Sequence, residues 1–309
     1  MDVVAEVVRS GFVESRHRGV AVRVGPDARV LWSLGDPSTV VFPRSANKPI
    51  QALAMLRAGL PLDGELLALA AGSHAGESFH LAGVRAILTQ AGLDESALRT
   101  PAAYPIDPHE HADLLRSGGT RAPILMDCSG KHAAMLLTCA VNGWPLDTYL
   151  HVDHPLQVLI TETFTEVTGS SPAVVGTDGC GAPLLGCSLA SLASAVGGMR
   201  RGEAGAEGDR LLEAWLSHPE YVSGTRRPER ALMGAVPGLV AKWGAESVYV
   251  VGLPDGTAIT LKIEDGAERP VYAVMNRIIE LAGVQADFLA ERPVVLGGGQ
   301  PIGEIRTAF

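Results

Sequence analysis

The chain has 309 residues, 47% hydrophobic and 19% charged, so it can bury a sizeable core and disorder is not expected. Its formal net charge of −9 argues against nucleic acid and anionic membranes as partners. No apolar run reaches the roughly 18 residues that a membrane helix requires. The acidic opening, Met1 to Glu6, lacks the basic and apolar regions of an export signal. We therefore expect a cytoplasmic protein whose four cysteines are reduced.

The first fifty residues are expected to form strands that lead into a helix. Short β-branched runs, separated by Gly and Asp turn signals, lie at 3–8, 20–24 and 30–34. A helical pattern follows over residues 50–60. Pro49 is tolerated in the first turn of a helix, which places Ser45 at or just before the helix start.

The middle of the chain, to about Arg210, has a helical pattern. Ala- and Leu-rich segments that predict helices lie at 65–71, 78–91, 130–141, 155–168 and 183–196. Strands return near the end, where two runs flank the hairpin signal Pro254-Asp255-Gly256. These last elements are strands over 247–251 and 257–263, an amphipathic helix over 271–282 and an edge strand over 302–307.

Strands at both ends around a helical middle predict an α/β fold. Both termini would complete one antiparallel sheet, and a helical domain would be inserted between them. We expect a single compact unit, residues 1–309. Its sheet subdomain would comprise 1–45 and 211–309, and its helical subdomain 46–210.

Two motifs place a nucleophile-capable side chain three residues before a lysine: Ser45 before Lys48, and Cys128 before Lys131. At a helix start these positions share a face, so the lysine can reach back to its partner. The helix N-terminus adds positive potential and free N–H groups for an oxyanion. Ser45 is therefore a candidate nucleophile and Lys48 its base, which requires a lysine pKa well below ~10.4. The alternative is a helix cap beside a surface lysine.

The segment Gly72-Ser73-His74 lies between two expected helices, and its small residues permit close approach of a ligand. Ser73 could supply a second hydroxyl that orients substrate or relays a proton. In the alternative interpretation, Ser73 or Ser78 caps the next helix and His74 is solvated.

Cys128 and Cys180 each lie in a glycine-lined turn next to an aspartate, and each turn is expected to precede a helix. Two thiolates, one nitrogen ligand and one open position would suit zinc. The alternative is a pair of buried thiols. Cys139 and Cys187 lie in apolar stretches and are expected to be buried spectators.

Two further basic positions are candidates for substrate contact. Arg226 or Arg227, in a polar turn, could clamp a substrate carboxylate, although a basic surface turn is the alternative. Lys242 precedes an expected strand and is followed two residues later by Gly244, which would let a substrate lie against the sheet edge.

Together these motifs resemble the rhizobial-type L-asparaginases, the third structural class, sometimes labelled asparaginase II. The resemblance spans nearly the whole chain and is carried by Ser45-Ala46-Asn47-Lys48-Pro49, Gly72-Ser73-His74, Asp127-Cys128-Ser129-Gly130-Lys131-His132 and Gly176-Thr177-Asp178-Gly179-Cys180-Gly181. It implies a fold similar to serine β-lactamases and penicillin-binding proteins. It also implies a homodimer that hydrolyses L-asparagine to L-aspartate and ammonia.

The resemblance further implies roles for individual residues. Ser45 matches the nucleophile and Lys48 its partner, and Ser73 and Lys242 match a second serine and lysine. Zinc ligands are matched by Cys128, Lys131 and Cys180, with Asp178 beside the metal. The expected substrate contacts are His132, Asp178 and Arg227. An ammonium has no lone pair, so Lys131 must lose its proton to bind zinc. His132 is therefore a competing nitrogen ligand.

The leading hypothesis is an amidohydrolase that acts on a small free amino acid amide, with asparagine as the expected substrate. Lys48 would accept the proton of Ser45 as its oxygen attacks the side-chain carbonyl, and water would then hydrolyse the acyl-enzyme. One alternative is a non-catalytic, zinc-dependent sensor of a small ligand. Another is a β-lactamase-like serine hydrolase of a different amide.

Overall fold

The computed structural model describes residues 1–285 and 294–309, and the chain divides into two compact units. The first comprises Met1–Ala46, Cys187–Arg201 and Ala231–Phe309; the second comprises Asn47–Gly186 and Gly202–Arg230. The first predicted boundary, after residue 45, lies within one residue of the observed one. The boundary predicted at residue 210 differs, because 187–201 belong to the sheet unit and 202–230 to the helical unit.

The first unit is built on an antiparallel sheet. Its strands follow the order β10-β11-β1-β2-β9-β8-β7, and β3 pairs with β2. The strands are β1 (Asp2–Arg9), β2 (Phe12–Val24), β3 (Val30–Leu34), β7 (Val240–Gly244), β8 (Val248–Gly252), β9 (Ala258–Ile263), β10 (Val294–Gly297) and β11 (Gln300–Thr307). A separate short strand, β4 (Val40–Val41), pairs with the end of β6 (Pro183–Ser188).

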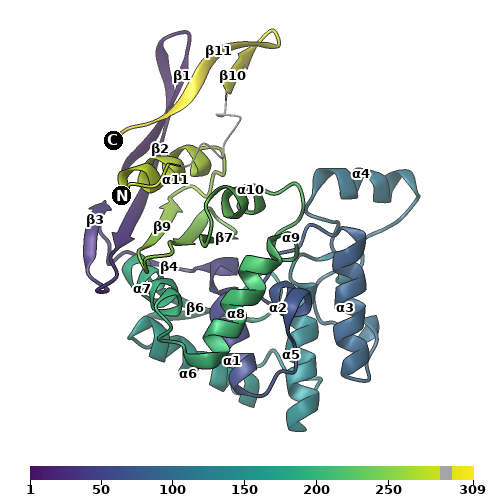
Figure 1. Cartoon of the computed structure of the whole chain (residues 1–309). Helices are drawn as coiled ribbons and strands as arrows, with labels where there is room; N and C mark the ends of the chain where they lie inside the picture. Colours follow the sequence, from purple (N-terminus) through teal and green to yellow (C-terminus); the bar gives the residue numbers. More distant parts are fainter. Residues whose placement is uncertain (286–293) are drawn as a thin grey trace. The chain divides into compact units, whose positions relative to one another are not determined.

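The two ends of the chain meet in this sheet. Val7 of β1 pairs with Ser15 of β2 on one side and with Ile305 of β11 on the other. The first and last strands therefore lie side by side, purple next to yellow in Figure 1. The prediction that both termini complete one antiparallel sheet is confirmed.

Helices cover both faces of the sheet. Val20 and Val22 of β2 point to the face on which α7 (Leu189–Arg200) packs. Successive strand residues point to opposite faces, so Ala21, which is also fully buried, points to the other one. There α11 (Val271–Leu281) contacts β1, β9 and β11 (Figure 1).

The second unit is mainly helical. Its helices are α1 (Lys48–Arg57), α2 (Gly64–Ala70), α3 (Ser78–Gln90), α4 (Pro108–Arg116), α5 (Ser129–Asn142), α6 (Pro155–Thr168), α8 (Gly205–Ser217) and α9 (Pro219–Val222). The strand β5 (Val174–Thr177) pairs with the start of β6, and α10 (Pro228–Ala235) runs on into the first unit. Short 3-10 turns are η1 (Arg44–Asn47), η2 (Glu95–Ala97) and η3 (Pro123–Leu125). Among the helices of residues 1–285 and 294–309, none is both long and apolar enough to cross a bilayer.

The end of α2 and the start of α5 meet in the second unit. α2 is contacted by α3, α5, α8 and α9, and its residues 67–70 are fully buried. A Cβ at Gly130 of α5 would lie only 2.9 Å from the carbonyl oxygen of Leu69 in α2. This close approach requires glycine. It brings the segments that follow α2 and precede α5 next to each other, and both carry motifs predicted to be functional.

The structure corrects the prediction of one helix over residues 183–196. Pro183–Ser188 instead forms the strand β6, and α7 follows it directly. A short apolar run fits a buried strand as well as a helix, and here pairing with β5 decides. The Ser188 hydroxyl then starts α7 by accepting the N–H of Ser191 at 3.0 Å. The turn that contains Cys180 therefore precedes a strand, not a helix.

Most other predicted elements are present with slightly different ends, and the strand over 30–34 and the helix over 155–168 have their predicted bounds. β2 begins earlier than expected, at Phe12, because the polar residues before Gly19 pair with β1. β7 was not predicted. Lys242 lies within it and, as predicted, precedes the strand expected over 247–251, which is β8.

Candidate active site

The amine of Lys48 is buried among oxygen atoms of two loops; only 1% of the residue is exposed. Its Nζ donates hydrogen bonds to Gly72 O at 2.7 Å, to the Ser73 hydroxyl at 2.9 Å and to Asp127 O at 3.4 Å. The Asp127 carboxylate lies 3.6 Å from the same nitrogen. A buried amine needs such partners because it has lost its hydration. Lys48 thereby ties the loop after α2 to the loop before α5.

Ser45 lies in the 3-10 turn η1, which leads directly into α1. Lys48 is the first residue of α1 and Pro49 the second, where the missing N–H of proline costs no helical hydrogen bond. The prediction that Ser45 stands at or just before a helix start is confirmed. The boundary between the units falls after Ala46, so Ser45 belongs to the first unit and Lys48 to the second. The role of Ser45 as nucleophile stays a prediction.

The loop that carries Ser73 is held on two sides. The Ser73 hydroxyl accepts the bond from Lys48, and the Ser73 N–H donates to Val222 O at 2.8 Å. His74 is fully buried, so the solvated alternative for this residue is wrong. The capping alternative is also wrong, since α3 begins at Ser78 and has Glu77 at its N-cap without a side-chain cap bond. Ser73 is therefore a hydroxyl placed against a buried amine.

The predicted pair of cysteines is brought together by the fold. Cys128 precedes α5, Cys180 lies in the turn between β5 and β6, and the two buried side chains belong to one packed cluster. Lys131 Nζ lies 3.2 Å from Cys180 Sγ, and the Asp178 carboxylate lies 3.5 Å from the same sulfur. Two sulfurs and one amine thus converge in a buried cluster, which Ala182 helps to enclose.

The charges in this cluster favour one thiolate. A hydrogen bond from Cys128 lowers the pKa of Cys180, and Lys131 lowers it further. The same hydrogen bond, together with burial, raises the pKa of Cys128. Burial alone would lower the pKa of Lys131, but the neighbouring sulfurs and Asp178 raise it. These charges thus favour the ionised form of Cys180 and the protonated form of Lys131.

The donor set fits zinc in the form predicted from the sequence. No three His, Cys, Asp or Glu side chains cluster closely enough to hold a metal ion anywhere in residues 1–285 and 294–309. The nitrogen of a site on the two thiols would come from Lys131 or from His132, whose ring also interacts with Cys180. The competing His132 has its Nδ1 2.7 Å from the Tyr149 hydroxyl. Two sulfurs and one nitrogen are ligands that zinc accepts, once Lys131 is deprotonated.

The remaining predicted site residues occupy distinct surroundings. His132 is fully buried, and burial lowers its pKa. Arg227 Nε lies 3.6 Å from the Glu229 carboxylate. Lys242, in the first unit, donates from Nζ to Trp243 O at 2.8 Å. Substrate contact by His132, Asp178 and Arg227, and catalysis by Lys242, stay predictions.

Cys139 and Cys187 are buried, as predicted for spectator thiols. Burial raises the pKa of each to about 12, so neither is a thiolate at neutral pH.

Acidic residues anchor the polar turn that precedes Arg227, and no sequence pattern pointed to them. Both carboxylate oxygens of Glu77 accept bonds from Thr225, one from its N–H and one from its hydroxyl, each at 2.7 Å. Arg226 donates two bonds of 3.0 Å to Asp107. Because these partners lie more than a hundred residues apart, only the folded chain reveals them. Arg226 is held by the fold, so the predicted substrate clamp rests on Arg227.

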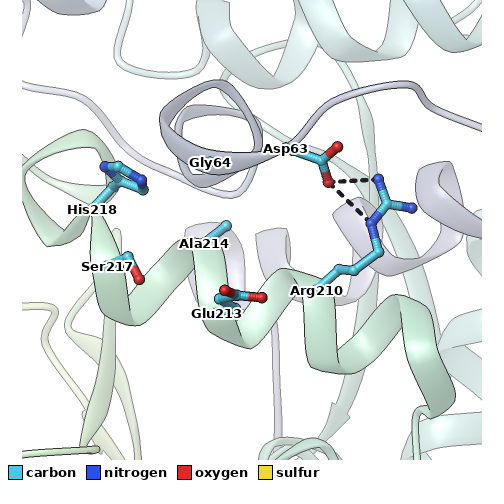
Figure 2. Close-up of a pocket in the computed structure, with 7 residues that line it drawn as sticks. All are labelled: Asp63, Gly64, Arg210, Glu213, Ala214, Ser217 and His218. Atoms are coloured by element: carbon cyan, nitrogen blue, oxygen red, sulfur yellow. Dashed lines mark hydrogen bonds and ion pairs between the residues drawn. The ribbon is translucent and has the colours of Figure 1, made fainter.

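A recess of about 240 Å³ also lies on the second unit, between the start of α2 and the helix α8 (Figure 2). Arg210 spans its edge and donates to Asp63 Oδ1 at 2.7 and 3.0 Å, the contacts dashed in Figure 2. None of the predicted site residues lines this recess.

Three solved structures illustrate what this chain is similar to. A β-lactamase from Mycobacterium bovis is 14% identical, with 86% of this chain and 95% of that chain covered and a TM-score of 0.50. EstCE1, described as a hydrolase with promiscuous acyltransferase activity, is 13% identical over 84% of this chain and 93% of its own, with a TM-score of 0.46. A mutant simvastatin synthase from Aspergillus terreus is 12% identical over 79% and 86%, with a TM-score of 0.42. No curated protein matches the sequence.

The likeness to the β-lactamase shows the fold, a β-lactamase- and penicillin-binding-like α/β arrangement, as predicted. The sequence profile of L-asparaginase II matches residues 5–307. The chain belongs to the L-asparaginase II family. It is thus a hydrolase of this family, and the family implies L-asparagine as substrate. The resemblance drawn from the motifs is confirmed.

The ion pair of Arg226 with Asp107, which holds the polar turn of this L-asparaginase II protein, gives a pH-dependent prediction. Burial would raise the pKa of Asp107, but hydrogen bonds from Arg226 and from backbone N–H groups hold it below its ordinary value. Such a group contributes stability that is present at neutral pH and is lost as pH falls through its folded pKa. Arg226→Met should lower the free energy of unfolding by about 1–2 kcal/mol at pH 7. The loss should shrink toward pH 4, where Asp107 in the variant takes up a proton.

Urea unfolding at pH 7 and pH 4 measures this difference. Arg116→Met is the matched control, because its ion pair with Asp113 on α4 is mostly exposed. That variant should lose less than about 0.5 kcal/mol at either pH. An Arg226→Met loss that is the same at both pH values would contradict the assigned role of Asp107.

Proposed function

We propose that the protein hydrolyses L-asparagine to L-aspartate and ammonia through a serine acyl-enzyme. Membership of the L-asparaginase II family supports the substrate. The observation that carries the mechanism is the contact between the buried Lys48 amine and the Ser73 hydroxyl. Lys48 also lies three residues after Ser45 in the chain. A buried amine among hydroxyls is the feature by which serine hydrolases can dispense with histidine.

The surroundings of Lys48 suit an amine that gains and loses one proton. Gly72 O and Asp127 O can only accept hydrogen bonds, so they hold two of its N–H groups in either state. The third position faces the Ser73 hydroxyl, which can accept from the ammonium or donate to the neutral amine. Ser73 can therefore relay the proton that Lys48 takes up and returns.

In the proposed reaction the Ser45 oxygen attacks the side-chain amide carbon, and the serine proton passes to Lys48. Free N–H groups at the start of α1 stabilise the oxyanion. The proton returns from Lys48 to the amide nitrogen as the C–N bond breaks, so ammonia leaves. Water then attacks the ester and gives one proton to Lys48. Lys48 returns that proton to the Ser45 oxygen as the ester bond breaks, which releases aspartate and restores the serine. The proposal also includes catalysis by Lys242 and substrate contact by Asp178, His132 and Arg227.

We propose that Cys128, Lys131 and Cys180 hold one zinc ion. The supporting observation is that the two sulfurs and the Lys131 amine converge in one buried cluster. When bound, zinc supplies a fixed positive charge and ties the start of α5 to the β5–β6 hairpin. The homodimer implied by the family resemblance stays a prediction.

Ser45→Ala should lower kcat for ammonia release from L-asparagine by about 10³-fold or more, because it removes the attacking oxygen. Lys48→Ala should be nearly as slow, and the double variant no slower than either, since the two residues act as one unit. The measurement is steady-state ammonia release at saturating L-asparagine.

Ser117→Ala, at an exposed serine after α4, is the control and should retain the parent rate. Near-normal ammonia release by Ser45→Ala would rule out the acyl-enzyme. Release of no ammonia by the parent protein would favour a ligand sensor or a hydrolase of another amide.

The purified protein should contain about one zinc per chain by elemental analysis. Lys131→Met, which keeps an unbranched apolar side chain, should lose the metal, and so should the double replacement of Cys128 and Cys180 by serine. His132→Ala and the control Cys139→Ala should keep it. Zinc retained by Lys131→Met but lost by His132→Ala would make the histidine the ligand. No zinc in protein purified without chelator would overturn the site.

A further inference from the structure

His74 joins the two loops that surround Lys48. Its backbone N–H donates to Asp127 O at 3.0 Å, and its imidazole Nε2 lies 2.8 Å from the Ser129 hydroxyl. Asp127 and Ser129 flank Cys128, so one residue holds the chain on both sides of that cysteine. His74 itself is fully buried and follows Ser73 directly.

The hydrogen bonds fix where the proton of His74 lies. The Ser129 hydroxyl donates its only proton to Ile124 O at 2.8 Å. Nε2 must therefore carry a proton and donate it to Ser129, which leaves Nδ1 as an acceptor. Burial, with a smaller contribution from His80, lowers the pKa of His74 to about 3. His74 is thus a neutral donor at any pH where the enzyme would work, not an acid or a base.

The bonds made by His74 affect the same atoms that hold the Lys48 amine. Two acceptors of that amine, Gly72 O and the Ser73 hydroxyl, immediately precede His74, and the third is Asp127 O. If the Nε2 donor were lost, the two loops would be joined by fewer bonds. Ser73 and Cys128 would then move relative to Lys48.

A second buried histidine serves as an internal comparison. His80 stacks on His74, with ring centroids 5.3 Å apart and planes at 24°. Its Nε2 lies 2.9 Å from Glu220 O, so His80 ties α3 to α9. It does not bond to the loops that hold the Lys48 amine. Both rings are buried, but only His74 bonds to the loop before α5.

We propose that His74 is a positioning residue that locks the Ser73 loop to the start of α5, and so sets the placement of Ser73 against Lys48 and of Cys128 in the thiol cluster. As far as it concerns turnover, this rests on the proposed asparagine hydrolysis. This role requires a hydrogen-bond donor at the position of Nε2. It does not require the side chain to gain or lose a charge. Glutamine can supply that donor from its own Nε2, and leucine cannot.

The first test compares His74→Gln with His74→Leu in steady-state ammonia release. His74→Leu should lower kcat by about 10- to 100-fold with KM changed less than about threefold, because a misplaced group costs turnover more than binding. His74→Gln should stay within about threefold of the parent kcat. Ser129→Ala should resemble His74→Leu, and combining these two changes should cost no more than either alone.

The second test does not depend on activity. Hydrogen exchange measured by mass spectrometry should rise in His74→Leu at residues 72–75 and 127–132. The matched control His80→Leu should raise exchange near Glu220 but leave those two segments, and kcat, close to the parent. Should His74→Leu not fold, His74→Gln and Ser129→Ala carry the same comparison.

Parent-like kcat and exchange in His74→Leu would overturn the proposal. So would a His74→Gln variant as slow as His74→Leu, since the donor would then be irrelevant. If the parent released no ammonia from L-asparagine while the exchange pattern held, the proposed function would fail and the positioning role of His74 would stand.

Discussion

The second unit is organised around one buried amine. Placing the Lys48 nitrogen away from water is costly unless its hydrogen bonds are replaced, and Gly72 O, the Ser73 hydroxyl and Asp127 replace them. Those partners come from two loops that are distant in sequence. The loops can meet because α2 and α5 approach closely at Gly130, where a side chain would collide with Leu69. A packing constraint between two helices thus creates the environment of the amine.

The same loop serves two groups of reactive atoms. Asp127 faces Lys48 through both its carbonyl and its carboxylate, and the next residue, Cys128, enters the thiol cluster with Cys180 and Lys131. Any shift of this loop therefore affects both the hydrogen bonds of the Lys48 amine and the positions of the sulfurs. We infer that a metal on the sulfurs would rigidify the support of Lys48 even if it never touched substrate. His74, bonded on both sides of Cys128, would transmit that rigidity to Ser73.

Local chemistry could be predicted from the sequence, and long-range partners could not. Pro49 and the three-residue spacing located Ser45 before a helix start, and glycine-lined turns marked Cys128 and Cys180 as a pair. The partner of the Ser73 hydroxyl, Lys48, lies 25 residues away and has no periodic signal. Pairing of β6 with β5 overrode an apolar run that also fits a helix, and the acids that hold Thr225 and Arg226 come from distant segments. In each failure a tertiary contact decided what the local pattern left open.

The claim on which the rest depends is that the Lys48 amine and the Ser73 hydroxyl stabilise each other. A double-mutant cycle on the free energy of unfolding, with Lys48→Met, Ser73→Ala and the combined variant, measures that interaction without reference to activity. We expect a favourable coupling of about 0.5–1.5 kcal/mol, the range for an intramolecular hydrogen bond. Losses that simply add, within about 0.3 kcal/mol, would show that the two groups do not interact and would contradict the central role given to Lys48.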